Sequence, residues 1–278
     1  MIKTLIGGIA VGIANIIPGV SGGTMLVILG IFNRLTEAIT NIVKPHHPNR
    51  MKDIYFLAQV LIGALIGLIG FAKILTFLFE NYSTQTYFWF IGMVIFSIPI
   101  FLKSELQGHK INWLFVLLGM AIIFGIEYLN PGETSTTTPT IPDLNITTCL
   151  VMTIVGVIGG FSMLLPGVSG SMVLLIIGQY HLFRTMLSNV LSFQLNIIIP
   201  LGFMGIGILL GIVAASALTK WAMATNRANM VSFLLGLITA SSIVLIPFDA
   251  TYNLTIIISS IITLLIGGVM VMGIDKLS

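Results

Sequence analysis

The sequence predicts an all-α polytopic membrane protein built from two repeats of inverted topology. Three observations carry this prediction. Hydrophobic residues make up 56% of the 278 residues and charged residues only 8%, whereas soluble domains carry about 25% charged residues. Apolar runs of about the 20 residues that span a bilayer recur along the chain. Finally, one thirteen-residue motif occurs twice.

The motif interrupts two of the apolar segments. Pro18–Gly30 reads PGVSGGTMLVILG, and Pro166–Gly178 reads PGVSGSMVLLIIG, 148 positions later, with eight of the thirteen residues identical. Repeated apolar segments that are broken by proline and glycine indicate a transporter binding site built from internal repeats.

Positive charges indicate how the segments cross the membrane. Unbroken segments are predicted at 54–79, 87–102, 111–129, 195–218, 230–247 and 254–274, and the two broken ones at 4–32 and 147–183. If both broken segments are re-entrant hairpins and the N-terminus is cytoplasmic, ten of the twelve Lys and Arg residues face the cytoplasm. If each crosses once, four face the cytoplasm and seven face outside. The positive-inside rule therefore favours the hairpins.

Each half then has one re-entrant helical hairpin and three transmembrane helices, an odd number of crossings, so the halves have opposite orientations. We expect one transmembrane domain over 1–278, with a first repeat at 1–129, an extracellular linker at 130–146 and an inverted second repeat at 147–278. Both termini are expected in the cytoplasm. Such inverted repeats support alternating access.

The small polar residues that open the second arm of each hairpin are the candidate substrate site. Pro18 and Pro166 end the first arms, and the glycine after each permits a turn. A helix N-terminus offers free N–H groups and about half a positive charge, which suits an anion. Two such tips meeting near the midplane would hold a phosphate-like group. The predicted site residues are Ser21, Gly22, Gly23, Thr24, Ser169, Gly170 and Ser171.

Helix packing is the alternative explanation for small residues in membrane helices. The Gly-Xaa-Xaa-Xaa-Gly spacing of Gly8 with Gly12, and of Gly156 with Gly160, predicts close contact between helices. We assign these four glycines to packing and the duplicated Pro-Gly-Val-Ser-Gly to ligand binding.

Three cations are candidates to support an anionic headgroup. Arg34 and Arg184 follow the two hairpins, and Lys73 lies within a span. Each also fits the role of an interfacial anchor, Lys73 by snorkelling toward Glu80. The roles of Asn33, Glu127 and His181 stay open.

Composition argues against several other classes. Cys149 is the only cysteine, which excludes an internal disulfide and a cysteine-based metal cluster. The net charge of +3 fits basic loops that face anionic lipids, without nucleic acid. No metal or cofactor is expected, and a homodimer is compatible with the sequence.

The two motif stretches resemble the signature of a bacterial family. Asn15-Ile-Ile-Pro-Gly-Val-Ser-Gly-Gly-Thr and Met163-Leu-Leu-Pro-Gly-Val-Ser-Gly-Ser are similar to those of the polyprenyl-phosphate transporters, long known only as a domain of unknown function. The resemblance covers the whole chain. It implies a non-enzymatic flippase of the bacterial cytoplasmic membrane that returns undecaprenyl phosphate from the outer to the inner leaflet for cell-wall synthesis. Many members carry acidic residues where this chain has Asn15, Asn33 and His181.

Three alternatives come from other functional classes. A rhomboid-type serine protease needs a histidine beside its serine, and no histidine lies inside a predicted span. A polyprenyl-diphosphate phosphatase would carry an arginine where Gly22 and Gly170 stand, and the loss of that charge argues against phosphoryl transfer. A small-anion transporter or channel stays open, because a backbone anion site does not specify a lipid.

Overall fold

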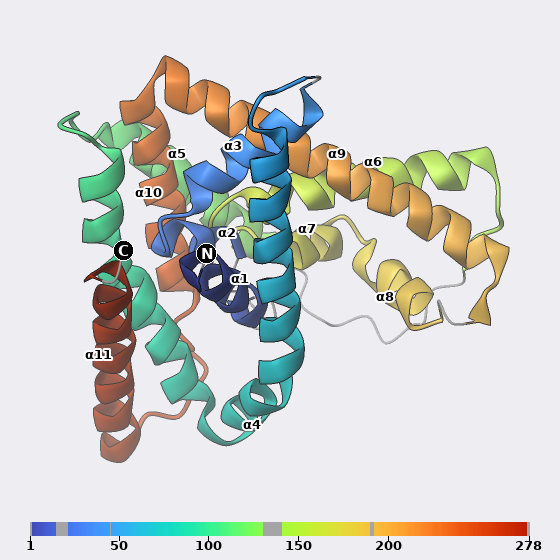
Figure 1. Ribbon diagram of the computed structural model, residues 1–278. Helices are drawn as coiled ribbons and strands as arrows, with labels where there is room; N and C mark the ends of the chain where they lie inside the picture. Colours follow the sequence, from blue (N-terminus) through green and yellow to red (C-terminus); the bar gives the residue numbers. More distant parts are fainter. Residues whose placement is uncertain (1, 15–21, 45, 130–140, 190–191, 277–278) are drawn as a thin grey trace.

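The computed structural model describes residues 2–14, 22–44, 46–129, 141–189 and 192–276, and these residues form helices joined by turns, with no strand among them (Figure 1). In chain order the helices are α1 (Ile2–Ala14), α2 (Gly22–Ile28), α3 (Phe32–Val43), α4 (Arg50–Glu105), α5 (Trp113–Tyr128), α6 (Ile146–Leu164), α7 (Gly170–Ile176), α8 (Tyr180–Ser188), α9 (Leu195–Thr225), α10 (Arg227–Val244) and α11 (Leu254–Lys276).

Within the described ranges, six helical stretches are long and apolar enough to cross a membrane. They are Arg50–Phe71 and Phe77–Glu105 within α4, the whole of α6, α9 and α10, and Leu254–Gly273 of α11. The prediction of an all-α polytopic membrane protein is confirmed at this level. Helix α5, predicted as a span, has 16 residues, fewer than the roughly 20 that cross a bilayer. Helix α6, predicted as one arm of a hairpin, is itself long enough to cross.

The segments predicted at 54–79 and 87–102 belong to one helix, α4, which breaks at Tyr82. The backbone of Tyr82 has φ −139° and ψ 42°, far from helical values. In Figure 1 the parts of α4 before and after the break run in different directions. Asn226, 144 positions later, has φ −149° and ψ 80° and separates α9 from α10. The two breaks therefore divide corresponding parts of the chain.

Two short helices, α3 and α8, follow the second arms of the predicted hairpins and were not expected. Helix α2 turns into α3 through a bend of 115°, and Gly30 in this bend has a φ of 65°, a value that glycine adopts without strain. Gly178, its counterpart, has a φ of 72° and precedes α8. Helix α3 packs between α4 and α9, so an element of the first half contacts the second.

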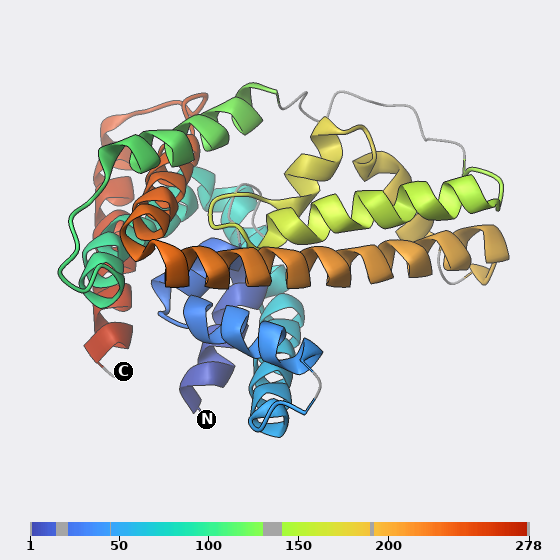
Figure 2. The same cartoon turned by 90° about the horizontal axis from the view of Figure 1, so that it is seen from above.

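The packing of the helices follows the same plan in the two halves. Helix α1 packs on the first part of α4 as α6 packs on α9, and the pair α6–α9 lies side by side in both orientations (Figures 1 and 2). The second part of α4 packs on α11 as α10 packs on α5. The last two pairs join helices from opposite halves.

Glycines make the pairs α1–α4 and α6–α9 close. A Cβ atom added to any of these glycines would collide with a backbone carbonyl of the opposing helix, so the helices approach backbone to backbone. They are Gly8, Gly12, Gly63 and Gly67 in the first pair, and Gly156, Gly160, Gly207 and Gly211 in the second. The packing role predicted for Gly8, Gly12, Gly156 and Gly160 is confirmed.

The two pairs that join the halves use glycines in the same way. Gly92 and Gly267 lie at the contact of α4 with α11, and Gly236 and Gly119 lie at the contact of α10 with α5. Gly236 is 144 positions after Gly92, and Gly267 is 148 after Gly119. The same offsets relate the glycines of the other two crossings, so the helix contacts repeat along with the sequence.

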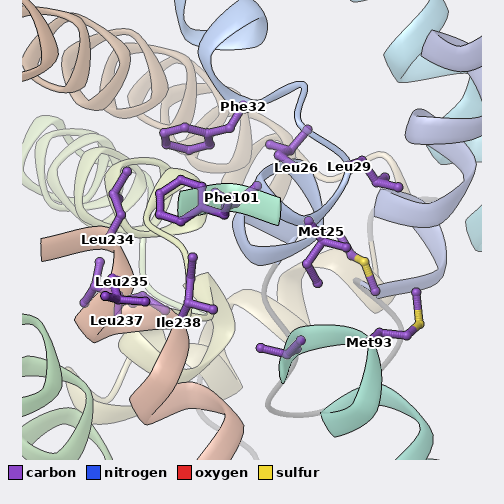
Figure 3. Close-up of a cluster of buried hydrophobic side chains, with 14 of the residues drawn as sticks. Met25, Leu26, Leu29, Phe32, Met93, Phe101, Leu234, Leu235, Leu237 and Ile238 are labelled. Atoms are coloured by element: carbon purple, nitrogen blue, oxygen red, sulfur yellow. The ribbon is translucent and has the colours of Figure 1, made fainter. Parts of the chain in front are cut away.

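The largest buried hydrophobic cluster lies where α2 meets α4 and α10. Figure 3 shows Met25 and Leu26 of α2 close to Met93 and Phe101 of α4, with Leu234 and its neighbours on α10 completing the cluster. Every residue of α2 is buried. Helix α2, predicted as the second arm of the first hairpin, is therefore fixed inside the protein.

We call the place where two helices touch through glycines a glycine crossing. On α9 we expect a Gly→Ala substitution to be tolerated only outside its crossing with α6. Gly211→Ala places a Cβ against the Val157 backbone, whereas Gly205 has no neighbour within 4 Å of the added atom. Overpacking costs about 1–3 kcal/mol, so Gly211→Ala should lower the thermal midpoint of the purified protein. Gly205→Ala should leave the midpoint unchanged or raise it slightly, because alanine favours a helix over glycine by up to about 1 kcal/mol. Equal midpoints for the two variants would contradict the close crossing.

Candidate functional site

The second motif forms a turn between two helices. Helix α6 ends at Leu164, Pro166 follows the C-cap residue Leu165, and α7 begins at Gly170. Gly167 has a φ of +82°, in the left-handed region that favours glycine. The helix ends before Pro166 and Gly167 lies in the turn, as the sequence predicts, while the hairpin itself stays a prediction. Ser169 is the N-cap residue of α7, and Ser171 lies in its first turn.

The two copies of the motif lie in contact. The backbone N–H of Gly167 donates a hydrogen bond to the Thr24 hydroxyl oxygen over 2.7 Å. A Cβ added to Gly23 would lie 2.9 Å from the Leu164 carbonyl oxygen, so the start of α2 touches the end of α6. Thr24 is buried, at 2% exposure. A buried backbone N–H at a helix break needs such a partner, and the other copy of the motif supplies it.

Two hydroxyl groups lie at the start of α7. The side-chain oxygens of Ser169 and Ser171 are 2.8 Å apart. The side chain of Ser169 makes no cap hydrogen bond to its own helix, and Ser171 is exposed. Because a hydroxyl both donates and accepts, the pair keeps hydrogen-bonding capacity for a ligand.

The turn at Gly167 packs against helices α5 and α10. A Cβ added to Gly167 would lie 2.8 Å from the Leu237 carbonyl of α10 and 3.1 Å from Ile123 of α5. The turn therefore rests on the pair that α5 and α10 form, and its position depends on their glycine crossing.

The structure groups some of the predicted site residues and separates others. Gly22, Gly23 and Thr24 form the buried first turn of α2, whereas Ser21 lies outside the described residues. Arg34 lies in α3 and Arg184, exposed, in α8; Lys73 is in α4, with its side chain outside the described part. Of the residues left open, Asn33 lies in α3, Glu127 is exposed near the end of α5, and His181 is partly buried in α8.

Arg34 belongs to a polar cluster that the sequence analysis missed. Its Nη2 atom lies 2.6 Å from Oδ1 of Asp53, and its guanidinium lies 4.9 Å from the centre of the Phe56 ring. Asn41 donates through Nδ2 to Oδ2 of Asp53 over 3.1 Å, and its Oδ1 accepts a 3.3 Å hydrogen bond from Nζ of Lys220. The cluster therefore joins α3 and α4 to α9.

Only a weak signal in the sequence pointed to this cluster. Asp53 directly precedes an apolar segment and follows the basic residues Arg50 and Lys52, a pattern typical of an ordinary cytoplasmic loop. Lys220 lies 167 positions after Asp53 in the sequence. Its hydrogen bond to Asn41 is made possible by the packing of α3 against α9. Among the described residues no group of three His, Cys, Asp or Glu side chains could hold a metal ion.

Comparison with known proteins identifies the family. A family model described as VCA0040-like, undecaprenyl phosphate translocase-like, matches residues 11–270. The chain belongs to this family. It is similar to a polyprenyl-phosphate transporter of Vibrio cholerae serotype O1, with 27% identity over 262 residues, which cover 91% of this chain and 80% of the relative. A polyprenyl-phosphate transporter of Staphylococcus aureus is 25% identical over 281 residues, covering 98% and 95%. No solved structure matches the chain significantly.

The Thr24 hydroxyl should stabilise the contact between the two motifs. Thr24→Val keeps the shape of the side chain but removes the acceptor of the Gly167 N–H. An unsatisfied buried donor costs about 1–3 kcal/mol, so the variant should unfold at a lower temperature than the parent. Thr24→Ser keeps the hydroxyl oxygen, so its unfolding temperature should fall much less. A thermal midpoint for Thr24→Val above that of Thr24→Ser would show that the hydrogen bond does not stabilise the fold.

Proposed function

We propose that this chain transports undecaprenyl phosphate across the cytoplasmic membrane and returns the phosphate headgroup from the outer to the inner leaflet, in recycling of the lipid carrier of cell-wall synthesis. Membership of the family and the names of the two relatives support the substrate class. The observation that carries the proposal is the hydrogen bond from Gly167 to Thr24, because it brings both copies of the motif to one place.

The headgroup site is proposed at the starts of α2 and α7. Ser169 and Ser171 offer hydroxyl donors, and the first turn of α7 offers backbone N–H groups. Both helices have only seven residues, so direct hydrogen bonds contribute more than a helix dipole. Gly22 and Gly170 leave no side chain at the position where a phosphatase would place its arginine. The site is therefore suited to hold a phosphate and to release it, without cleaving it.

An inverted arrangement of the two halves supports alternating access. The order of helices repeats, the glycine crossings repeat at offsets of 144 and 148, and the positive charges favour two hairpins that enter from opposite sides. In this topology, α7 belongs to the hairpin that enters from outside. Helix α2 is wholly buried, whereas Ser171 of α7 and Ile177 at its C-cap are exposed. This difference supports a site that is reached from the outer side in the present conformation.

Cysteine labelling tests the proposed topology. Cys149 is the only cysteine and is buried, so a Cys149→Ala background should react little. In intact cells a membrane-impermeant maleimide should label both Asp143→Cys and Gln194→Cys, which flank the second hairpin at exposed positions. His109→Cys, exposed on the cytoplasmic side, should react only after lysis. Protection of Gln194→Cys in intact cells would mean that the segment from α6 to α8 crosses the membrane once.

Exchange of lipid between leaflets tests the function. In liposomes that contain undecaprenyl phosphate, the parent protein should accelerate exchange of the headgroup. Ser169→Ala with Ser171→Ala removes two donors, and a hydrogen bond to a charged group is worth about 1.5–3 kcal/mol, so the double variant should exchange at least about tenfold more slowly. Ser104→Ala is the matched control, because its hydroxyl bonds the Phe101 carbonyl at the end of α4.

Each contrary outcome of the exchange assay has a distinct meaning. No acceleration by the parent overturns the lipid-transport proposal. Transport of inorganic phosphate without lipid exchange would identify a small-anion transporter, and release of phosphate from undecaprenyl diphosphate would identify a phosphatase. Unchanged exchange in the double serine variant would place the headgroup elsewhere.

A further inference from the structure

Asp53 is the one charged side chain that is fully buried among the described residues. Its side chain is 1% exposed, and it lies in the first turn of α4, at the start of the apolar stretch Arg50–Phe71. A buried ionised carboxylate is costly unless it is paired and hydrogen-bonded.

The repeat shows that the fold does not require a charge at this position. The glycine crossings align Gly63 with Gly207 and Gly67 with Gly211 at an offset of 144, and this offset places Asp53 opposite Ile197. Ile197 is 1% exposed, so the second half buries an isoleucine where the first half buries an aspartate. Replacing a buried ion pair by an apolar residue is often neutral or stabilising. Packing alone therefore does not explain Asp53.

The carboxylate has one direct cation and one hydrogen-bond donor. Oδ1 is paired with Arg34 but has no hydrogen bond of good geometry, and Oδ2 accepts from Asn41. Lys220 contacts only the far end of the Asn41 amide. Loss of Arg34 would leave a buried carboxylate with no direct cation.

Arg34 is accessible where Asp53 is not. The side chain of Arg34 is 39% exposed, and that of Asp53 is 1% exposed. A phosphate headgroup that has reached the cytoplasmic side can therefore approach the guanidinium, which binds phosphate bidentately as it binds a carboxylate. Once Arg34 binds the phosphate, burial disfavours the charged form of Asp53, and the carboxylate takes a proton from the solvent.

We propose that Asp53 is a proton-binding site, and that it is protonated when Arg34 transfers from Asp53 to an anionic phosphate headgroup. The inference rests on the proposed lipid substrate. The other charged or titratable groups around Asp53 are Lys220 on α9, His47 in the turn before α4, and the exposed Arg50 and Lys52 on α4 itself. These groups are basic, and the acidic residue of α3, Glu37, is exposed, so Asp53 is the buried carboxyl group of this cluster.

Proton uptake on lipid binding tests this inference. A short-chain polyprenyl phosphate is added to the parent, to Asp53→Asn and to Glu37→Gln in weakly buffered detergent near neutral pH, with a pH-sensitive dye, and bound lipid is counted in the same sample by native mass spectrometry. The parent should take up about one proton more per bound lipid than Asp53→Asn, since one carboxyl is protonated. Glu37, exposed on α3, is the matched control, and Glu37→Gln should behave as the parent does.

Infrared spectroscopy of the parent protein tests the same inference without a substitution, so the result does not depend on whether Asp53→Asn folds. The difference spectrum on adding lipid, with aspartate isotopically labelled, should show the C=O band of a protonated aspartic acid. Lipid binding without this band, or with equal proton uptake in the parent and Asp53→Asn, overturns the proton site and leaves the transport proposal intact. Absence of bound lipid in the parent overturns both.

Discussion

Backbone contact at the glycine crossings is the constraint on which the rest of this structure depends. At each crossing a side chain larger than hydrogen would meet a carbonyl of the opposing helix. Because lipid provides no hydrophobic force between helices, such close packing is a main source of helix association in membranes. Two crossings, α4 with α11 and α5 with α10, connect the halves. They bring α10 under the turn at Gly167, and α2 lies buried against α1 and α4.

The buried helix α2 also supplies a hydrogen-bond partner at the break between α6 and α7. A turn at membrane depth leaves backbone groups without intrahelical partners, and Thr24 satisfies one of them in the other motif. The first copy of the motif therefore has a structural reason to carry a hydroxyl residue at Thr24, where the second copy has Met172. The copies differ in use: Thr24 is committed to the Gly167 N–H, whereas Ser169 and Ser171 bond each other at an accessible position. Among the motif hydroxyls in the part of the chain that the structure describes, Ser169 and Ser171 are the ones that keep hydrogen-bonding capacity.

The sequence predicted the features that have local or periodic causes. Apolar length predicted the membrane helices, and the Pro166-Gly167 pair predicted the turn before α7 because proline and glycine act on their own backbone. The spacing of Gly156 and Gly160 predicted close packing. Helix α3 was missed because its buried face forms only against α4 and α9. Likewise, Asp53 gave no sign of burial, since its partners come from α3, and through them α9, rather than from its sequence neighbours. Contacts between distant helices are what the sequence alone did not predict.

The breaks at Tyr82 and Asn226 add a mechanical consequence to this arrangement. They separate two glycine-packed pairs, α1 with the first part of α4 and α6 with α9, from the four helices that join the halves. A change of angle at the two breaks would move each pair as a unit, because the glycine contacts lie on either side of a break and not across it. Asp53 lies on one pair and Lys220 on the other, linked through Asn41. In the proposed transport cycle, Arg34 leaves Asp53 for the phosphate and Asp53 is protonated. The negative charge between Arg34 and Lys220 is then lost, which would weaken the link between the two helix pairs.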